Sequence, residues 1–157
     1  MQLATTGKKV RGITRKQVQS LVIRPIVKYF MTPSPHAIGA EQTLARAHEM
    51  MRDHDIRHLP VLQGGHLVGV LSQRDLYLIE TFGDSKPETI LVSEAMSTEV
   101  FTVGPDASVA RVSQEMAKKK YGCAVVMCEG RLDGIFTTID AIQALNHYIR
   151  RATARHP

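Results

Sequence analysis

A hydroxyl and a carboxylate recur in the same arrangement at two places in this chain. Ser72 precedes Asp75 by three residues, and Thr137 precedes Asp140 by three residues, each directly after an apolar run that begins with glycine. Each pair is typical of a capping box, which satisfies backbone N–H groups at a helix start. The same corner can bind a ligand, because a helix start attracts anions and a carboxylate accepts hydrogen bonds from vicinal hydroxyls. A ribose phosphate suits this chemistry, so we interpret the two pairs as the functional centre.

Basic side chains near the first pair would strengthen binding of a phosphate. Arg57 and His58 precede a Leu-Pro-Val strand, and Arg74 stands inside the first corner. His58 is either a phosphate ligand or an ordinary half-buried strand residue, and Arg74 either reaches phosphate or faces water. The second copy has Gly-Cys in place of Arg-His, and its Lys120 is either a phosphate ligand or a solvated helix end. We therefore predict two unequal sites, with the stronger one at Asp75.

Both corners belong to a duplication with a period of 65 residues. Residues 27–75 align with residues 92–140 without a gap, and 11 of 49 aligned positions are identical. Each copy predicts an extended piece, a helix, a hairpin of two strands and a closing helix. One such unit has too small a sheet to be stable alone. We therefore expect two copies packed sheet to sheet, with both helix starts pointing into a cleft between them.

Apolar periodicity and turn residues place these elements. The first helix of each copy should begin after a side-chain cap, Thr43 in one copy and Ser108 in the other. Glycine-containing turns separate the strands of each hairpin. We expect the strands at residues 58–62, 67–71, 123–128 and 132–136. The closing helices should run from Ser72 towards residue 82 and from Thr137 towards residue 150.

The charge of the chain is unevenly distributed. Residues 1–30 carry seven Lys or Arg and no acid, and residues 147–157 carry three Arg and no acid. The body, residues 31–146, has 10 basic and 15 acidic side chains, a net charge of −5. An acidic body argues against a nucleic-acid footprint on the fold itself, although basic ends can bind polyanions.

Several classes of protein are disfavoured by what the sequence lacks. No apolar run approaches the roughly 20 residues of a membrane span, and the N-terminus has no signal core. No P-loop, nucleophile elbow or HExxH metal motif is present, so we expect neither catalysis nor a metal site. Cys123 and Cys128 are the only cysteines and read as inert, mostly buried thiols, which favours a cytoplasmic, reducing location. The methionines read as core filler.

The duplicated motifs resemble the cystathionine-β-synthase (CBS) domain pair. Met-Thr and Met-Ser open the copies at residues 31 and 96, Ile-Arg-His-Leu-Pro-Val fills residues 56–61, and Gly-x-x-Ser/Thr-x-x-Asp closes each copy. The resemblance implies an α/β (α+β) fold of tandem CBS domains, two pseudo-symmetric β-α-β-β-α modules. It divides the chain into a basic N-terminal extension (1–25), a first CBS domain (26–82), a linker (83–91), a second CBS domain (92–147) and a basic C-terminal tail (148–157).

The resemblance also implies a function. It indicates a non-enzymatic regulatory module without a cofactor, which binds AMP, ADP or ATP between its two halves, with S-adenosylmethionine a poorer candidate. Asp75 and Asp140 would hold ribose hydroxyls, and adenine would lie between apolar walls. The residues implied at phosphate are Ser72, Thr137, Arg57, His58, Arg74 and Lys120.

Two kinds of partner are expected. CBS pairs often occur fused to an enzyme or transporter, and a chain of 157 residues has no room for one. A protein partner in trans, or a homodimer formed through helix faces rich in Ala, Met and Leu, would then read the signal. The alternative is that the basic ends bind nucleic acid or an acidic membrane surface while the CBS pair only dimerises.

Overall fold

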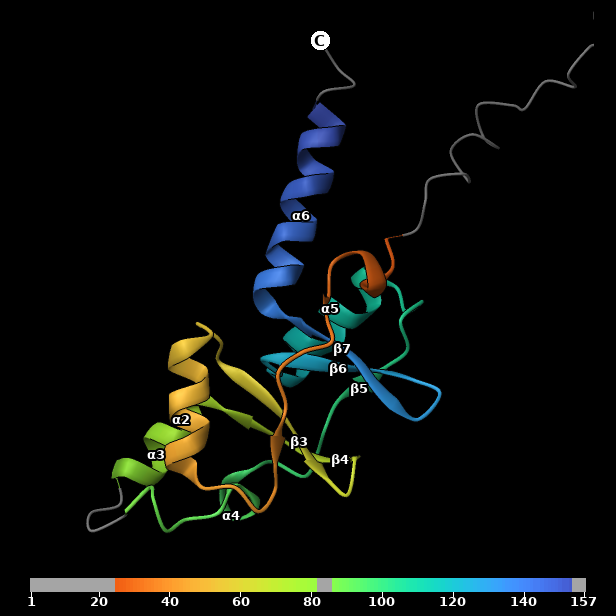
Figure 1. Ribbon diagram of the computed structural model, residues 1–157. Helices are drawn as coiled ribbons and strands as arrows, with labels where there is room; N and C mark the ends of the chain where they lie inside the picture. The colour runs from red at the N-terminus through yellow and green to blue at the C-terminus, as the bar shows by residue number, and fades with distance from the viewer. Residues whose placement is uncertain (1–24, 82–85, 154–157) are drawn as a thin grey trace, which may run out of the picture.

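The computed structural model describes residues 25–81 and 86–153, which form two half-units with the same order of elements (Figure 1). The first half contains β2 (Ile38–Gly39), α2 (Leu44–Asp53), β3 (His58–Gln63), β4 (His66–Ser72) and α3 (Gln73–Thr81). The second half contains β5 (Thr102–Val103), α5 (Val109–Lys119), β6 (Cys123–Cys128), β7 (Arg131–Thr137) and α6 (Thr138–Thr153). The mixed α+β fold with two matching β-α-β-β-α halves is therefore confirmed.

The hairpins occur where the turn residues predict them. Strands β3 and β4 pair antiparallel through a two-residue loop, and β6 and β7 do the same. The loop residues all have positive φ: 57° at Gly64, 81° at Gly65, 49° at Glu129 and 75° at Gly130. Two successive residues with positive φ are the mark of a turn whose twist matches that of the flanking strands, and glycine adopts this conformation at little cost.

Helix α2 begins with the predicted side-chain cap, whereas α5 does not. The Thr43 Oγ1 accepts a hydrogen bond from Arg46 N at 3.3 Å. Ser108 stands at the N-cap of α5, but its side chain makes no cap hydrogen bond, so that part of the prediction is wrong. The first N–H of both helices is bound by a backbone carbonyl: Val109 N donates to Pro25 O at 2.8 Å, and Leu44 N donates to Ile90 O at 2.9 Å. One N–H group at each helix start is therefore satisfied by the backbone, and only α2 has a side-chain cap in addition.

The opening segments of the two halves change places, which the repeat did not reveal. The 3-10 helix η1 (Val27–Tyr29) places Val27 in the core of the second half, and the short helix α4 (Val92–Ala95) places Val92 in the core of the first half. Strand β1 (Thr32–Pro33) pairs with β7, and Ser97 forms an isolated bridge with Val70 of β4. The two sheets are therefore β2-β3-β4 and β1-β7-β6-β5.

A contact between a glycine and a methionine holds each opening segment against the strand of the opposite half. A Cβ atom built on Gly69 would lie 2.9 Å from Met96 Cγ, and one built on Gly134 would lie 3.0 Å from Met31 Cγ. These separations are too short for carbon atoms, so both strands need glycine where the opposite methionine crosses them. The four residues are among the identical pairs of the repeat, and this contact explains their identity.

The two cores are filled as the sequence predicts. Met51 and Met116 are buried in the cores of the first and second halves, respectively. Cys123 is buried, and this burial raises its pKa to about 12, so the thiol is a poor nucleophile. Cys128 is only half-buried. Met51, Met116 and Cys123 therefore act as ordinary apolar core residues.

Candidate functional site

A cleft of about 1360 Å³ lies between the two halves and receives side chains from both. Its walls include the starts of β3 and β6, the ends of β4 and β7, and the first turns of α3 and α6. All eight residues that the sequence proposes as ligand contacts line this one cleft: Arg57, His58, Ser72, Arg74, Asp75, Lys120, Thr137 and Asp140. Their juxtaposition follows from the packing of the halves, whereas their binding role stays a prediction.

The first corner joins β4 to α3 and is closed by its own hydrogen bonds. Asp75 Oδ2 accepts hydrogen bonds from Ser72 N at 2.8 Å and from Ser72 Oγ at 2.6 Å. Ser72 Oγ in turn accepts from Asp75 N at 3.3 Å. Both residues are partly buried, so the corner is a rigid capping box in the wall of the cleft.

The second corner, between β7 and α6, repeats this geometry. Asp140 Oδ2 accepts from Thr137 N and from Thr137 Oγ1, both at 2.7 Å, and Thr137 Oγ1 accepts from Asp140 N at 3.4 Å. The next backbone N–H is also used in the same way at both corners: Gln73 N donates to Arg57 O at 2.9 Å, and Thr138 N donates to Gly122 O at 3.1 Å. The pseudo-symmetry therefore extends to individual hydrogen bonds.

These contacts decide which atoms of a corner face a ligand. The hydroxyl hydrogen of Ser72 or Thr137 is already donated to the neighbouring carboxylate, so a phosphate would have to compete for it. The Oδ1 atoms of Asp75 and Asp140 accept no hydrogen bond from any residue that the structure describes. Each corner thus offers one uncommitted carboxylate oxygen, which is the kind of acceptor that a ribose diol needs.

His58 lines the cleft and touches the opposite half. A Cβ atom built on Gly122 would lie 3.0 Å from His58 Cε1. The imidazole therefore packs directly against the backbone of Gly122, the residue before β6. Burial lowers the pKa of His58, Asp75 opposes this effect, and Arg74 and Arg57 reinforce it. Burial therefore favours the neutral imidazole of His58, because its pKa lies below 6.5.

The permanently charged groups line the same cleft from exposed positions. Arg57 and Arg74 are exposed, and Lys120 ends α5 in the left-handed conformation with φ 59°. At the second corner, Ile139 and Cys123 occupy the positions aligned with Arg74 and His58. The aligned positions of the second corner thus carry no arginine, and the unequal strength of the two sites stays a prediction.

An aromatic wall in the second half escaped the sequence reasoning. The rings of Phe101 and Tyr121 stack with centroids 5.4 Å apart at an angle of 25°. The Tyr121 hydroxyl donates to Glu99 Oε1 at 2.9 Å, and this hydrogen bond raises the pKa of Tyr121. All three residues line the cleft. Only a comparison of differing positions would have found them, because Ser34, His36 and Ile56 stand at the aligned positions of the first copy.

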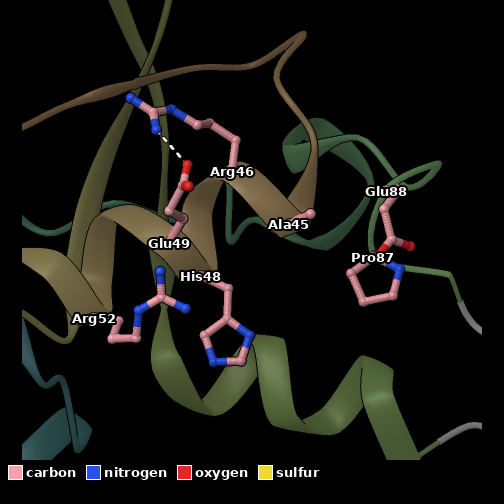
Figure 2. A pocket seen from close by; sticks show the side chains of 7 residues that line it. All are labelled: Ala45, Arg46, His48, Glu49, Arg52, Pro87 and Glu88. Carbon is pink, nitrogen blue, oxygen red and sulfur yellow. Dashed lines mark hydrogen bonds and ion pairs between the residues drawn. The ribbon is translucent and has the colours of Figure 1, made fainter.

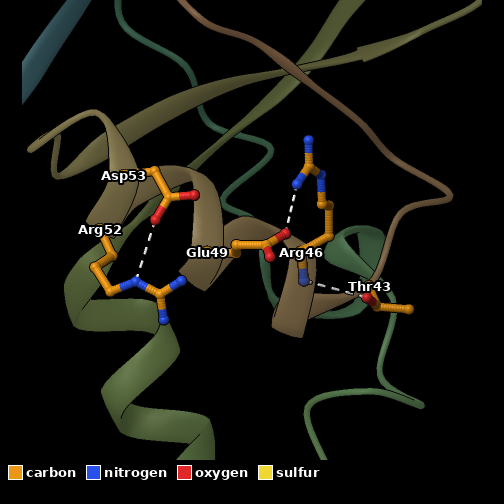
Figure 3. Close-up of polar contacts among 5 residues, drawn as sticks. All are labelled: Thr43, Arg46, Glu49, Arg52 and Asp53. Atoms are coloured by element: carbon orange, nitrogen blue, oxygen red, sulfur yellow. Dashed lines mark hydrogen bonds and ion pairs between the residues drawn. The ribbon is translucent and has the colours of Figure 1, made fainter.

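A smaller hollow of about 420 Å³ lies beside α2 (Figure 2). It contains Arg46 and Arg52, but each arginine contacts an acid on its own helix: Arg46 pairs with Glu49, and Arg52 Nε lies 3.2 Å from Asp53 Oδ1 (Figure 3). These side chains are exposed, and such surface pairs contribute little to stability. We assign no binding role to this hollow.

Two features of the described residues concern a metal site and a membrane span. Residues 25–81 and 86–153 contain no group of three or more His, Cys, Asp or Glu placed to hold a metal ion. Within the same ranges, no helix is both long and apolar enough to cross a membrane. Most of the basic ends, residues 1–24 and 154–157, lie outside the described residues, so the structure does not bear on polyanion binding by these ends.

Comparison with known proteins identifies the family. The CBS domain family model matches the chain twice, over residues 27–79 and 92–147. The chain belongs to the CBS domain family. An inosine-5′-monophosphate dehydrogenase from Korarchaeum cryptofilum is 32% identical over 133 residues, which cover 84% of this chain. This chain spans only a quarter, 25%, of the length of that enzyme.

Solved structures of CBS proteins share the fold. An acetoin utilization protein (AcuB) from Vibrio cholerae aligns with a TM-score of 0.75 and 30% identity, covering 86% of this chain and 100% of that chain. CBSX2, whose structure is a complex with AMP, aligns with a TM-score of 0.68 and 22% identity, covering 78% of this chain and 97% of that chain. The tandem arrangement of two CBS domains in this protein is thus the one found in these neighbours.

Proposed function

We propose that this protein is a regulatory module, not an enzyme, that binds an adenosine nucleotide in the cleft between its two CBS domains. The observation that carries the proposal is the pair of matching corners, each presenting an uncommitted aspartate oxygen to one shared cleft. Ribose hydroxyls would donate to Asp75 Oδ1 or Asp140 Oδ1, and the phosphate would lie towards the cationic side chains. The AMP complex of CBSX2 supports this choice of ligand by analogy of fold.

The Asp75 corner is proposed as the stronger site. Arg74 lies at this corner, and Lys120 lines the same cleft. A phosphate approaching His58 would also favour protonation of the imidazole, because a nearby negative charge stabilises the charged form. The second corner has Ile139 in place of Arg74 and therefore offers less positive charge to a phosphate.

Binding would act as a signal by changing the relative orientation of the two halves. A ligand shifts such an equilibrium only by its difference in affinity for the two states. Residues of both halves line the cleft. A ligand bound there would contact both halves and stabilise one of their relative orientations. We propose that a protein partner in trans, or a second copy of the chain, reads this change.

Titration calorimetry with AMP, ADP, ATP and S-adenosylmethionine tests the proposal. The variants are Asp75→Asn and Asp140→Asn, because asparagine keeps one oxygen for the corner and replaces the other acceptor by an NH₂ donor. We expect Asp75→Asn to weaken nucleotide binding by about 1.5–3 kcal/mol, the scale of a hydrogen bond to a charged group. Asp106→Asn, an exposed acid outside the cleft, is the control. Absence of heat with all four ligands would disprove the function.

A homodimer through α6 forms part of the proposal. Residues Ala141, Ala144 and Tyr148 of α6 are buried or half-buried. The next residue after each of them, Ile142, Leu145 and Ile149, is apolar and 52–61% exposed. A helix that is apolar over two adjacent faces is normally covered on both. A second copy related by a twofold axis is the simplest cover, since such an interface uses the same helix face twice.

A further inference from the structure

Glu99, Phe101 and Tyr121 form a polar and aromatic cluster, the Glu99 cluster, in the cleft wall contributed by the second half. The two rings stack 5.4 Å apart, and the Tyr121 hydroxyl holds Glu99 Oε1 at 2.9 Å. The rings present flat apolar surface, and the tyrosine fixes where the carboxylate stands. Glu99 is exposed and lines the cleft, and its other oxygen, Oε2, accepts no hydrogen bond from any residue that the structure describes.

The exchange of opening segments brings this cluster to the Asp75 end of the cleft. Val70 N donates to Ser97 O at 3.0 Å, and Ser97 N donates to Val70 O at 2.9 Å. Val70 lies on β4, two residues before the first corner. Gly122, the residue after Tyr121, packs against His58, and Asp75 is close enough to His58 to oppose the lowering of its pKa by burial. The second half therefore supplies a wall for the corner that the first half builds.

The other end of the cleft has different chemistry. The positions aligned with the Glu99 cluster are Ser34, His36 and Ile56. His36 stacks on His54 with ring centroids 3.7 Å apart, and this wall has neither a carboxylate at position 34 nor a hydroxyl at position 56. Any ligand contact made by Glu99 is therefore specific to one end.

We propose that the Glu99 cluster reads the base of the nucleotide bound at the Asp75 end, with Glu99 accepting a hydrogen bond from the exocyclic amino group of adenine. This inference rests on the proposed function. An ionised carboxylate only accepts hydrogen bonds, so it favours a base edge that carries an N–H donor. Stacking on Phe101 and Tyr121 would hold the base without distinguishing its edge, because every base has a π-face.

The test compares AMP with purine riboside 5′-monophosphate, which lacks only the amino group. Calorimetry on the full chain should show AMP binding about tenfold tighter, the scale of a hydrogen bond to a charged group. Glu99→Met keeps the length of the side chain but removes the acceptor, so the ratio of the two affinities should fall to about one. Glu88→Met, an exposed glutamate outside the cleft, should keep the tenfold ratio.

Tyr121→Phe separates recognition of the amino group from stacking of the base, and the two aspartate variants show at which end of the cleft the nucleotide binds. Tyr121→Phe keeps the ring but loses the hydroxyl that positions Glu99, so it should lower the ratio while purine riboside 5′-monophosphate binds as before. Asp140→Asn should leave the ratio unchanged, whereas Asp75→Asn should weaken both ligands together. AMP binding with an affinity ratio that Glu99→Met does not alter would overturn this inference and leave the proposed function standing. Absence of AMP binding by the unsubstituted chain would overturn both.

Discussion

His58 of the first half packs its imidazole against the backbone of Gly122 in the second half, where any side chain would collide with it. The two residues begin the central hairpins of their halves, and both line the cleft. Since Gly122 O also accepts from Thr138 N, the contact ties His58 to the start of α6. The relative position of the two corners therefore depends on a residue pair that crosses the interface between the halves.

Gly122→Ala should displace His58 and destabilise the fold. The added Cβ would overlap the imidazole ring of His58. Relieving this clash requires the half-buried His58 side chain to move. We expect a loss of about 1–3 kcal/mol in the free energy of unfolding, the usual cost of overpacking. Urea denaturation measures it. Gly104→Ala is the matched control, because a Cβ there meets nothing within 4 Å. An equal loss in both variants, or an undiminished loss in the double variant with His58→Ala, would contradict the clash.

The buried state of His58 predicts how stability depends on pH. Burial lowers the pKa of His58 below 6.5, so the folded state favours the neutral imidazole while the unfolded chain binds a proton near 6.5. The unfolded state then holds more protons between these two pKa values, and stability falls as pH drops from about 6.5 towards the folded pKa. His58→Gln should reduce the stability lost between about pH 7.5 and pH 5.5. His66→Gln, at an exposed position, should not. An unchanged slope in His58→Gln would show that other groups carry the acid sensitivity.

The sequence predicted the elements well because the duplication tests every assignment twice. Strand β6 has the predicted bounds, and the glycine turns set both hairpins. The exchange of Val27 and Val92 was not predictable, since apolar character indicates burial but not which of two similar cores receives the residue. Glu99, Phe101 and Tyr121 were not predictable from the repeat either, because they differ from the aligned residues of the first copy.

The local chemistry of the corners was predicted in type but not in detail. A hydroxyl followed by an acid indicates both a cap and an anion site, and only the distances show that the hydroxyl hydrogen is committed to the carboxylate. Likewise, the sequence leaves open whether His58 is a phosphate ligand or a half-buried strand residue. The lowering of its pKa follows first from burial, and its contact with Gly122 of the opposite half is one that no local pattern contains.

Thr43 and Ser108, which stand at aligned positions, should respond differently to substitution. Thr43→Ala removes a side-chain cap from α2 and should cost about 1 kcal/mol in the free energy of unfolding. Ser108→Ala should cost clearly less, because the Ser108 side chain makes no cap hydrogen bond, while the first N–H of each helix is bound by a backbone carbonyl in both halves. Chemical denaturation of the two single variants provides the comparison, and each serves as the control for the other. Equal losses would show that Ser108 stabilises its helix start in solution after all.

The uncovered face of α6 predicts that the chain is a dimer and that one added charge dissociates it. Leu145 is 60% exposed on the folded chain, so Leu145→Asp should leave the fold intact while placing an unpaired charge in the dimer contact. Light scattering at micromolar concentration should give twice the mass of one chain for the unsubstituted protein and the mass of one chain for the variant. Gln143→Asp adds the same charge at an exposed polar position of the same helix and should remain dimeric. A monomeric unsubstituted protein, or a dimer that survives Leu145→Asp, would remove α6 as the interface.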